Sequence, residues 1–152
     1  MFKHILVPVD GSATAFSAVD NALALAKAFG SEVTAVYVID PYPFTGVGAD
    51  FAYGQDQYLT AATAEANAAV DAVAARLQDA GVPVYKRVVE ASSASRGILE
   101  AAQAVNADLI VMGSHGRRGL EKLVLGSVAQ RVLSGASLPV LVVHGKQAAA
   151  QA

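Results

Sequence analysis

The chain has 152 residues, enough for one domain with a hydrophobic core and too few for two. Its 54% hydrophobic and 16% charged residues exclude a disordered chain, and its net charge of -2 excludes a global positive field for nucleic acid or an acidic membrane. The absence of cysteine excludes disulfides, thiolate catalysis and cysteine-ligated metals. No apolar run reaches the roughly 18 residues of a membrane span or the core of a signal peptide, so we expect a cytoplasmic protein.

The first 40 residues predict a strand, a helix and a second strand. The continuous apolar run over 4–9 is typical of a strand that is buried on both faces. A turn at Asp10 and Gly11 is followed by apolar residues three and four positions apart as far as Gly30, which predicts a helix with a glycine stop. The β-branched residues of 32–39 predict the second strand.

Residues 41–58 interrupt this regular pattern. They contain two prolines, three glycines and five of the ten aromatic residues, with neither helical nor strand periodicity. We predict a long loop or lid here. It is either a responsive element or a hydrophobic flap packed over the second strand or a dimer partner.

The rest of the chain again alternates helices and strands. Periodicity and stop signals predict, in order, a helix over 59–80, a strand over 82–90, a serine-capped helix over 92–107, a strand over 108–113, a helix over 127–137, a strand over 138–144 and a frayed tail over 146–152.

This alternation implies an α/β fold, with an open, doubly wound, five-stranded parallel sheet and helices on both faces. The strand orders 3-2-1-4-5 and 2-1-3-4-5 both fit. The first order puts the switch point between the first and fourth strands, where ligands bind in open α/β sheets. A crevice is then expected between Asp10 and Gly113, at the carboxyl ends of those strands.

A loop rich in glycine and basic residues, "GSHGRRGLEKLVLGSV", begins at this switch point. Glycines let peptide N–H groups approach an anion, and the first turn of a helix offers further N–H groups to phosphate. Ser127 adds a hydroxyl, and nearby charge comes from His115, Arg117, Arg118 and Lys122. The alternative is structural: the glycines turn the chain, Ser127 caps its helix and the arginines are solvated.

Asp10 also has two interpretations, as the N-cap of the first helix or as an acceptor for ribose hydroxyls or a base amine. It stands without the paired acids of a phosphorylated receiver domain. The P-loop and dinucleotide fingerprints are also absent. The three histidines, His4, His115 and His144, show no metal-binding spacing, so we expect them to be surface or partly buried.

The spacing of Gly113, Gly116, Gly126 and Ser127 is G-x2-G-x9-G-[ST], which resembles the ATP-binding branch of the universal stress protein family. The segments "ILVPVDGS", "VYVID" and "SLPVLVV" are similar to the same family. The resemblance covers about 2–145, which implies one domain over 1–145 with the adenine nucleotide alpha hydrolase-like, Rossmann-like fold.

The resemblance implies a site for ATP, with Mg²⁺ or Mn²⁺ bridging the phosphate oxygens. It assigns the adenine and ribose to Pro8, Val9, Asp10 and Val38, the ribose and α-phosphate to Met112 and Gly113, and the phosphates to Gly116, Gly126, Ser127 and Val128. It also implies a homodimer joined through Pro139 to Val143, which would cover an exposed strand edge.

Three functions follow from these observations. The first is a nucleotide-dependent regulatory or stress-response protein, in which ATP alters the dimer or the aromatic segment and so an interaction with an unidentified protein partner. The second is a slow ATPase or autophosphorylating enzyme, although no residue is committed to orienting the attacking water. The third is an adapter that uses the fold without a ligand.

Overall fold

A computed structural model of the chain describes residues 1–41, 49–114 and 125–144, and of residues 49–53 the backbone alone. The predicted tail over 146–152 lies outside these ranges. The helices and strands of the described residues are β1 (His4–Pro8), α1 (Ala13–Phe29), β2 (Glu32–Ile39), α2 (Ala49–Asp79), β3 (Val84–Glu90), α3 (Ala94–Ala104), β4 (Leu109–Gly113), α4 (Ser127–Gly135) and β5 (Val140–Val143).

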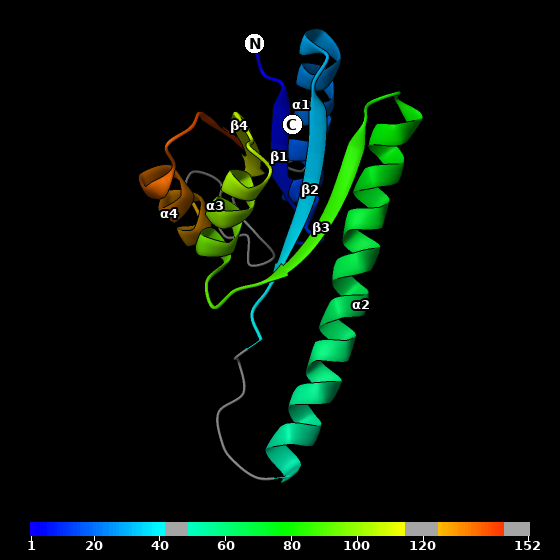
Figure 1. Cartoon of the computed structure of the whole chain (residues 1–152), viewed down its shortest axis with the longest axis vertical. Helices are drawn as coiled ribbons and strands as arrows, with labels where there is room; N and C mark the ends of the chain where they lie inside the picture. Colours follow the sequence, from blue (N-terminus) through cyan, green and yellow to red (C-terminus); the bar gives the residue numbers. More distant parts are fainter. Residues whose placement is uncertain (42–48, 115–124, 145–152) are drawn as a thin grey trace, which may run out of the picture.

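The five strands form one parallel sheet in the order β3-β2-β1-β4-β5. This confirms the doubly wound fold and decides for the order 3-2-1-4-5. Helices α1 and α2 cover one face of the sheet and α3 and α4 the other (Figure 1). Since the chain winds in opposite directions from β1, the switch point lies between β1 and β4.

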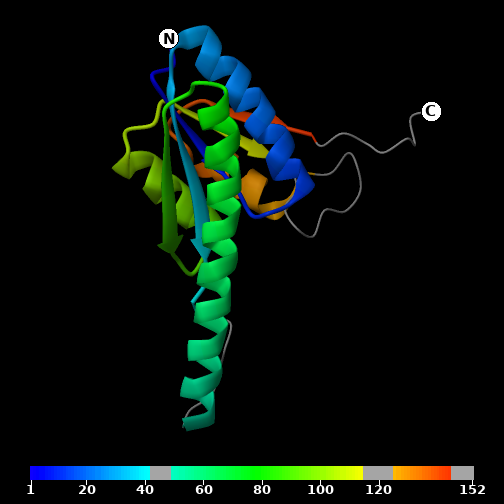
Figure 2. The ribbon, with the colours of Figure 1, turned by 90° about the vertical axis from the view of Figure 1, so that its right-hand side faces the viewer.

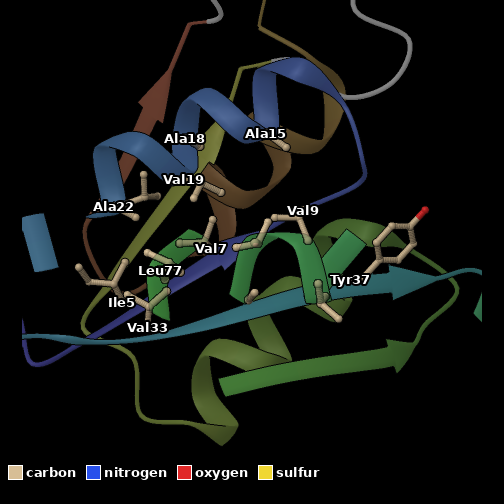
Figure 3. Close-up of a cluster of buried hydrophobic side chains, with 14 of the residues drawn as sticks. Ile5, Val7, Val9, Ala15, Ala18, Val19, Ala22, Val33, Tyr37 and Leu77 are labelled. Carbon is tan, nitrogen blue, oxygen red and sulfur yellow. The ribbon is translucent and has the colours of Figure 1, made fainter. Parts of the chain in front are cut away.

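The larger of two cores lies between the sheet and helices α1 and α2. Figure 3 shows apolar side chains of β1 and β2 meeting those of α1 and Leu77 of α2. Side chains alternate along a strand, so Leu6, Val36 and Ile110 point the other way, into a second core with α3 and α4. The two cores therefore cover both faces of the sheet.

The predicted loop over 41–58 is wrong in its second half, because α2 already begins at Ala49. Gly54 is the one strong helix breaker in this part of α2, and its cost is about 1 kcal/mol. Two side chains fasten the helix to the end of β2. The amide of Gln55 donates to the carbonyl of Pro41 at 2.9 Å, and the Tyr58 hydroxyl donates to the carbonyl of Asp40 at 3.0 Å.

The amino-terminal part of α2 projects beyond the carboxyl ends of the strands (Figure 2). It therefore extends past the edge of the sheet at which the switch point opens. Across the described ranges, no helix combines the length and apolar character needed to cross a membrane.

Candidate functional site

Strands β1 and β4 are hydrogen-bonded at their amino ends, and their ladder ends before their carboxyl ends. Their pairing consists of Ile5 with Leu109 and Leu6 with Ile110, although β1 runs on to Pro8 and β4 to Gly113. In contrast, β1 pairs with β2 along its whole length. The hydrogen-bond ladder between β1 and β4 therefore ends at the predicted switch point.

Pro8 accounts for the end of this pairing. Val9 donates to the carbonyl of Val36 in β2, whereas the carbonyl of His4 accepts from the N–H of Asp108, next to β4. Because peptide groups alternate between the two sides of a strand, the backbone nitrogen of Pro8 faces β4. A proline has no N–H to donate, so the ladder stops at the place where the sequence predicts the crevice.

Asp10 lies just beyond the carboxyl end of β1, where the chain turns into α1. Its carboxylate accepts the N–H of Ser12 at 2.9 Å, and Gly11 between them has φ +83°. The cap of α1 is Ser12, whose hydroxyl accepts from Ala15 N–H at 3.2 Å. The interpretation of Asp10 as the helix cap is therefore wrong, since Asp10 shapes the turn before it.

Gly113 lies at the end of β4, against the first turn of α1. A Cβ at this position would lie 2.6 Å from Cγ2 of Thr14 and 3.1 Å from its backbone carbonyl carbon. Sequence reasoning assigned Gly113 to the ligand and missed this packing role. The side chain of the neighbouring Met112 is buried among α3 and α4, so only its backbone is available to the crevice.

Val38 offers its backbone to the same region. Val36 hydrogen bonds toward β1, through Val9, and Ile39 bonds on the β3 side, through Ala91. By alternation, the N–H and carbonyl of Val38 turn toward β1, beyond the last paired residue of that strand. The Val38 peptide is therefore placed at the crevice side of β2.

The side chain of Val38 points away, toward α3. A Cβ on Gly97 would lie 2.7 Å from Cγ1 of Val38, so the helix approaches the strand closely at this point. The predicted serine cap of α3 is confirmed, because Ser93 accepts from Arg96 N–H at 3.3 Å. Gly97 is unfavourable inside a helix, and this close packing against Val38 explains why a glycine stands there.

Helix α4 follows the glycine loop in the chain, so its amino terminus lies next to the point where the loop ends. Its N-cap is Gly126, which has φ -66° and ψ 159° and makes no side-chain cap bond, so the idea that Ser127 caps the helix is wrong. Gly126 N–H donates to the carbonyl of Ser114 at 2.7 Å. The N–H groups of Ser127 and Val128 lie in the first turn, where a helix has no carbonyl of its own to offer them.

The bond between Gly126 and Ser114 fixes where the intervening segment leaves and rejoins the fold. A second bond, from the Gln130 amide to the carbonyl of Leu125 at 2.9 Å, supports the return. Both ends of the glycine loop are therefore tied to the end of β4. The loop residues themselves lie outside the described residues: His115, Gly116, Arg117, Arg118, Gly119 and Lys122.

The described residues supply no protein-only metal centre, because none of them form a group of three or more potential metal ligands. His4 is a partly buried residue, as predicted. Its Nε2 lies 2.6 Å from the Thr34 hydroxyl and its Nδ1 3.4 Å from Glu32. Among the predicted site residues, Asp10 and Ser127 are the two that carry side-chain oxygens, so a metal there would depend on oxygens of the ligand itself.

The chain is thus an α/β domain with a doubly wound sheet, whose switch point has a glycine and a helix amino terminus beside it. The chain belongs to the universal stress protein family, whose model matches residues 1–144. Universal stress protein MJ0531 of Methanocaldococcus jannaschii is 39% identical over 143 residues, covering 94% of this chain and 82% of the relative.

Solved structures agree with this assignment. The structure of MJ0577, a protein of the same organism, superimposes with a TM-score of 0.83 at 31% identity, covering 97% of this chain and 99% of the other. A universal stress protein in complex with cAMP has a TM-score of 0.67 at 25% identity, covering 95% and 98%.

Proposed function

We propose that this chain is a cytoplasmic regulatory protein of the stress response that binds ATP in the crevice between β1 and β4. The observation that carries the proposal is the end of the β1–β4 ladder after Leu6 and Ile110, at the switch point and beside the amino terminus of α4. The crevice is lined by backbone groups, which suit a ligand with a flat polar edge at one end and phosphates at the other.

The base and ribose belong to the β1 and β2 side in this proposal. The Val38 peptide offers one donor and one acceptor, the complement of an adenine edge with an amine and a ring nitrogen. Pro8, Val9 and Asp10 border the ribose, and the partly buried Asp10 carboxylate accepts its hydroxyls while it holds the turn at Ser12.

The phosphates lie toward α4 in this proposal. The N–H groups of Ser127 and Val128 and the positive end of the helix dipole attract the charge. The backbones of Met112 and Gly113 approach the ribose and α-phosphate, and Gly116 belongs to the same set. A bound Mg²⁺ or Mn²⁺ would be held mainly by the ligand and would neutralise part of the phosphate charge. The cAMP complex of a relative supports an adenine nucleotide as the ligand class.

Gly126→Val tests this site. The φ and ψ of Gly126 are those of extended backbone, which valine adopts readily, so the domain should fold with a cost of at most about 1 kcal/mol. The added branch next to the first turn of α4 should weaken Mg-ATP binding at least tenfold in isothermal titration. Circular dichroism should match that of the parent protein.

Ala136→Val is the matched control, because Ala136 is the C-cap of the same helix and is also extended, with φ -79° and ψ 141°. This variant should bind ATP as the parent does. Equal binding by parent, control and Gly126→Val would remove the nucleotide site from α4, and no binding by the parent would leave the adapter function.

Dimerisation through β5 belongs to the same proposal. This strand is the edge of the sheet beyond β4, and Leu141 on it is 38% exposed. A second copy pairing with Pro139 to Val143 would cover the edge and this side chain. Leu141→Lys should shift the mass measured by light scattering from dimer to monomer, and a parent protein that is already monomeric would end this part of the proposal.

ATP regulates such a dimer only through a difference in its affinity for two states. The projecting end of α2 extends past the same edge of the sheet as the crevice, which makes residues 49–58 a candidate for the element that responds. Slow hydrolysis is the alternative outcome. Turnover at saturating ATP in the parent and in His115→Ala would show whether the loop histidine takes part in it.

A further inference from the structure

Gln130 lies near the start of α4 and holds the two residues that precede this helix. Its side-chain Nε2 donates to the carbonyl of Leu125 at 2.9 Å, and its N–H donates to the carbonyl of Gly126 at 3.0 Å. The residue is exposed and belongs to neither hydrophobic core. Its two bonds therefore fix the entry of the chain into α4 rather than the packing of the helix.

The peptide group between Leu125 and Gly126 is held at both of its polar ends. Its carbonyl accepts from Gln130 Nε2, and its N–H donates to the carbonyl of Ser114 at 2.7 Å. A trans peptide group is planar, with its carbonyl and its N–H pointing in opposite directions, and the described residues contain no cis bond. Bonds at both ends of the plane therefore fix its orientation.

The next peptide group, between Gly126 and Ser127, carries one of the donors of the proposed nucleotide site. Its carbonyl accepts from the N–H of Gln130, in the first hydrogen bond of the helix. Because the two ends of this plane are opposed, the Ser127 N–H points away from the helix at its amino end. Gln130 thus contacts both of the peptide groups that set the direction of this N–H.

Helices α1 and α3 are held at their amino ends in a different way. In α1, Ser12 accepts the N–H of Ala15. In α3, Ser93 accepts the N–H of Arg96. Each serine therefore uses one of the first-turn donors of its helix. The glycine N-cap of α4 makes no such bond, and Gln130 binds a carbonyl outside the helix instead. The start of α4 is thus fixed without a cap side chain on its first-turn donors, which suits a helix that binds an anion.

Glutamine suits this position by its length and by its charge. Its amide reaches back five residues to a carbonyl and donates to it. A carboxylate of the same length could not, because carboxylates only accept hydrogen bonds. The amide is also neutral, so it adds no negative charge near the helix terminus at which the phosphates would lie.

We propose that Gln130 is a positioning residue of the nucleotide site, a role that rests on the proposed function. It holds the peptide groups on both sides of Gly126, so that the first-turn donors of α4 are directed at the phosphates before the ligand binds. Without it, these groups would have to be ordered during binding, at a cost in affinity. The effect acts on the phosphates and leaves the contacts of the base and ribose unchanged.

The test compares the parent with Gln130→Met by isothermal titration of Mg-ATP, Mg-ADP and AMP. Methionine is similar to glutamine in length and helix propensity but cannot donate. Mg-ATP should bind about fivefold more weakly, the effect of one lost hydrogen bond, and AMP should lose less affinity. An unchanged affinity for Mg-ATP, or the same loss for every nucleotide that binds, would overturn the proposal. A parent that binds no nucleotide would instead remove the proposed function, and this role with it.

Two further variants separate the lost bond from a general effect of substitution. Gln78→Met, at an exposed position in the last turn of α2, is the matched control and should bind as the parent does. Gln130→Glu should weaken Mg-ATP more than Gln130→Met, because its carboxylate repels both the Leu125 carbonyl and the phosphates. Both variants of Gln130 should keep the circular dichroism of the parent and a melting temperature within about 4 °C of it. A glutamate variant that binds as tightly as the parent would contradict the proposed role.

Hydrogen exchange without nucleotide tests the positioning itself. The Gly126 N–H is bonded to Ser114 and should be protected in the parent. In Gln130→Met its peptide group loses one of two bonds, so exchange at Gly126 should become several-fold faster. The Ala136 N–H, which donates to Val132 at the far end of the same helix, should exchange as in the parent. Equal exchange at Gly126 in both proteins would show that the peptide is held without Gln130 and would end the proposal.

Discussion

The two ends of the β1 and β4 pair are built in opposite ways. At the amino end, the Asp108 carboxylate accepts the N–H groups of Lys3 at 2.9 Å and His4 at 3.0 Å, and the N–H of Asp108 returns a bond to His4. At the carboxyl end, Pro8 offers no donor and the ladder ends. One side chain adds hydrogen bonds between the strands where the sheet begins, and one missing N–H ends their ladder before the sheet ends.

This difference divides the tasks of the chain between the two ends. At the amino end, these polar groups form hydrogen bonds with other groups of the protein. The Ser31 hydroxyl donates to the Phe2 carbonyl at 2.5 Å, and the Glu32 N–H donates to the Lys3 carbonyl at 2.9 Å. At the carboxyl end, backbone groups of β2 and α4 belong to the proposed nucleotide site. Substitutions at the amino end should therefore change stability alone, and those at the carboxyl end should change ligand binding.

Gly113→Ala should have the largest effect on stability. It is an exception to this division, because Gly113 lies at the carboxyl end and its substitution should change both stability and ligand binding. The new methyl group would lie 2.6 Å from Cγ2 of Thr14 and 3.1 Å from Thr14 backbone atoms, which cannot move independently of α1. We expect a loss of about 1–3 kcal/mol in the free energy of unfolding, measured by urea denaturation. Thr14→Ser removes the closest atom and should restore part of that loss in the double variant; strict additivity would contradict the contact.

Ser12→Ala tests how much the N-cap of α1 contributes to stability at the carboxyl end of the strands. Loss of the hydroxyl that accepts from Ala15 N–H should cost about 1 kcal/mol of stability. Ser93→Ala, which removes the equivalent cap of α3, is the matched variant and should cost a similar amount. Both proteins should still bind ATP within about threefold of the parent. A tenfold loss in Ser12→Ala would mean that the serine contacts the ligand.

Asp108→Asn tests the carboxylate hydrogen bonds at the amino end, through the pH dependence of the unfolding free energy. Burial opposes the charge, but hydrogen bonds from Lys3 and His4 N–H outweigh it and lower the pKa of Asp108 below its ordinary value of 3.8. A carboxylate whose folded pKa is depressed stabilises the fold above its unfolded pKa, and this contribution disappears as the pH falls through the folded pKa.

We therefore expect the parent to exceed Asp108→Asn by about 0.5–1 kcal/mol in unfolding free energy at pH 7, a modest figure because solvent screens the site. The difference should shrink below about pH 4. ATP binding should be unchanged at pH 7. A difference that stays constant down to pH 2 would show that the charge plays no part.

The architecture and the place of the crevice could be predicted because they follow from local patterns. Alternating strand and helix periods require right-handed crossovers, and these leave few sheet orders. The stop at Gly30 was also predictable: its φ of 69° lets the N–H reach the carbonyl of Ala26, which is the usual end of a helix. Together these signals place Asp10 and Gly113 at one edge of the sheet.

Other features depend on contacts between distant residues and could not be read from a pattern. The start of α2 at Ala49 is supported by the bond from Gln55 to Pro41, in a stretch whose glycines and aromatics suggest a loop. Gly113 is explained by Thr14, which lies 99 positions earlier in the chain. The choice of Ser12 over Asp10 as the cap was ambiguous, since both residue types cap helices and the two are near neighbours.

Pro8→Ala should change stability least. It is the most direct test of why the β1–β4 ladder is present at the amino end and absent at the carboxyl end. The alanine N–H would face β4, toward the carbonyl of Val111, and would allow the ladder to continue where it now stops. The gained hydrogen bond and the lost rigidity of proline each amount to about 1 kcal/mol and oppose each other, so the unfolding free energy should change little. The new amide should be protected in hydrogen exchange, and Mg-ATP should bind several-fold more weakly because the crevice narrows. Unprotected exchange at this position would show that the strands part for a reason other than the proline, such as the packing of Gly113 against α1.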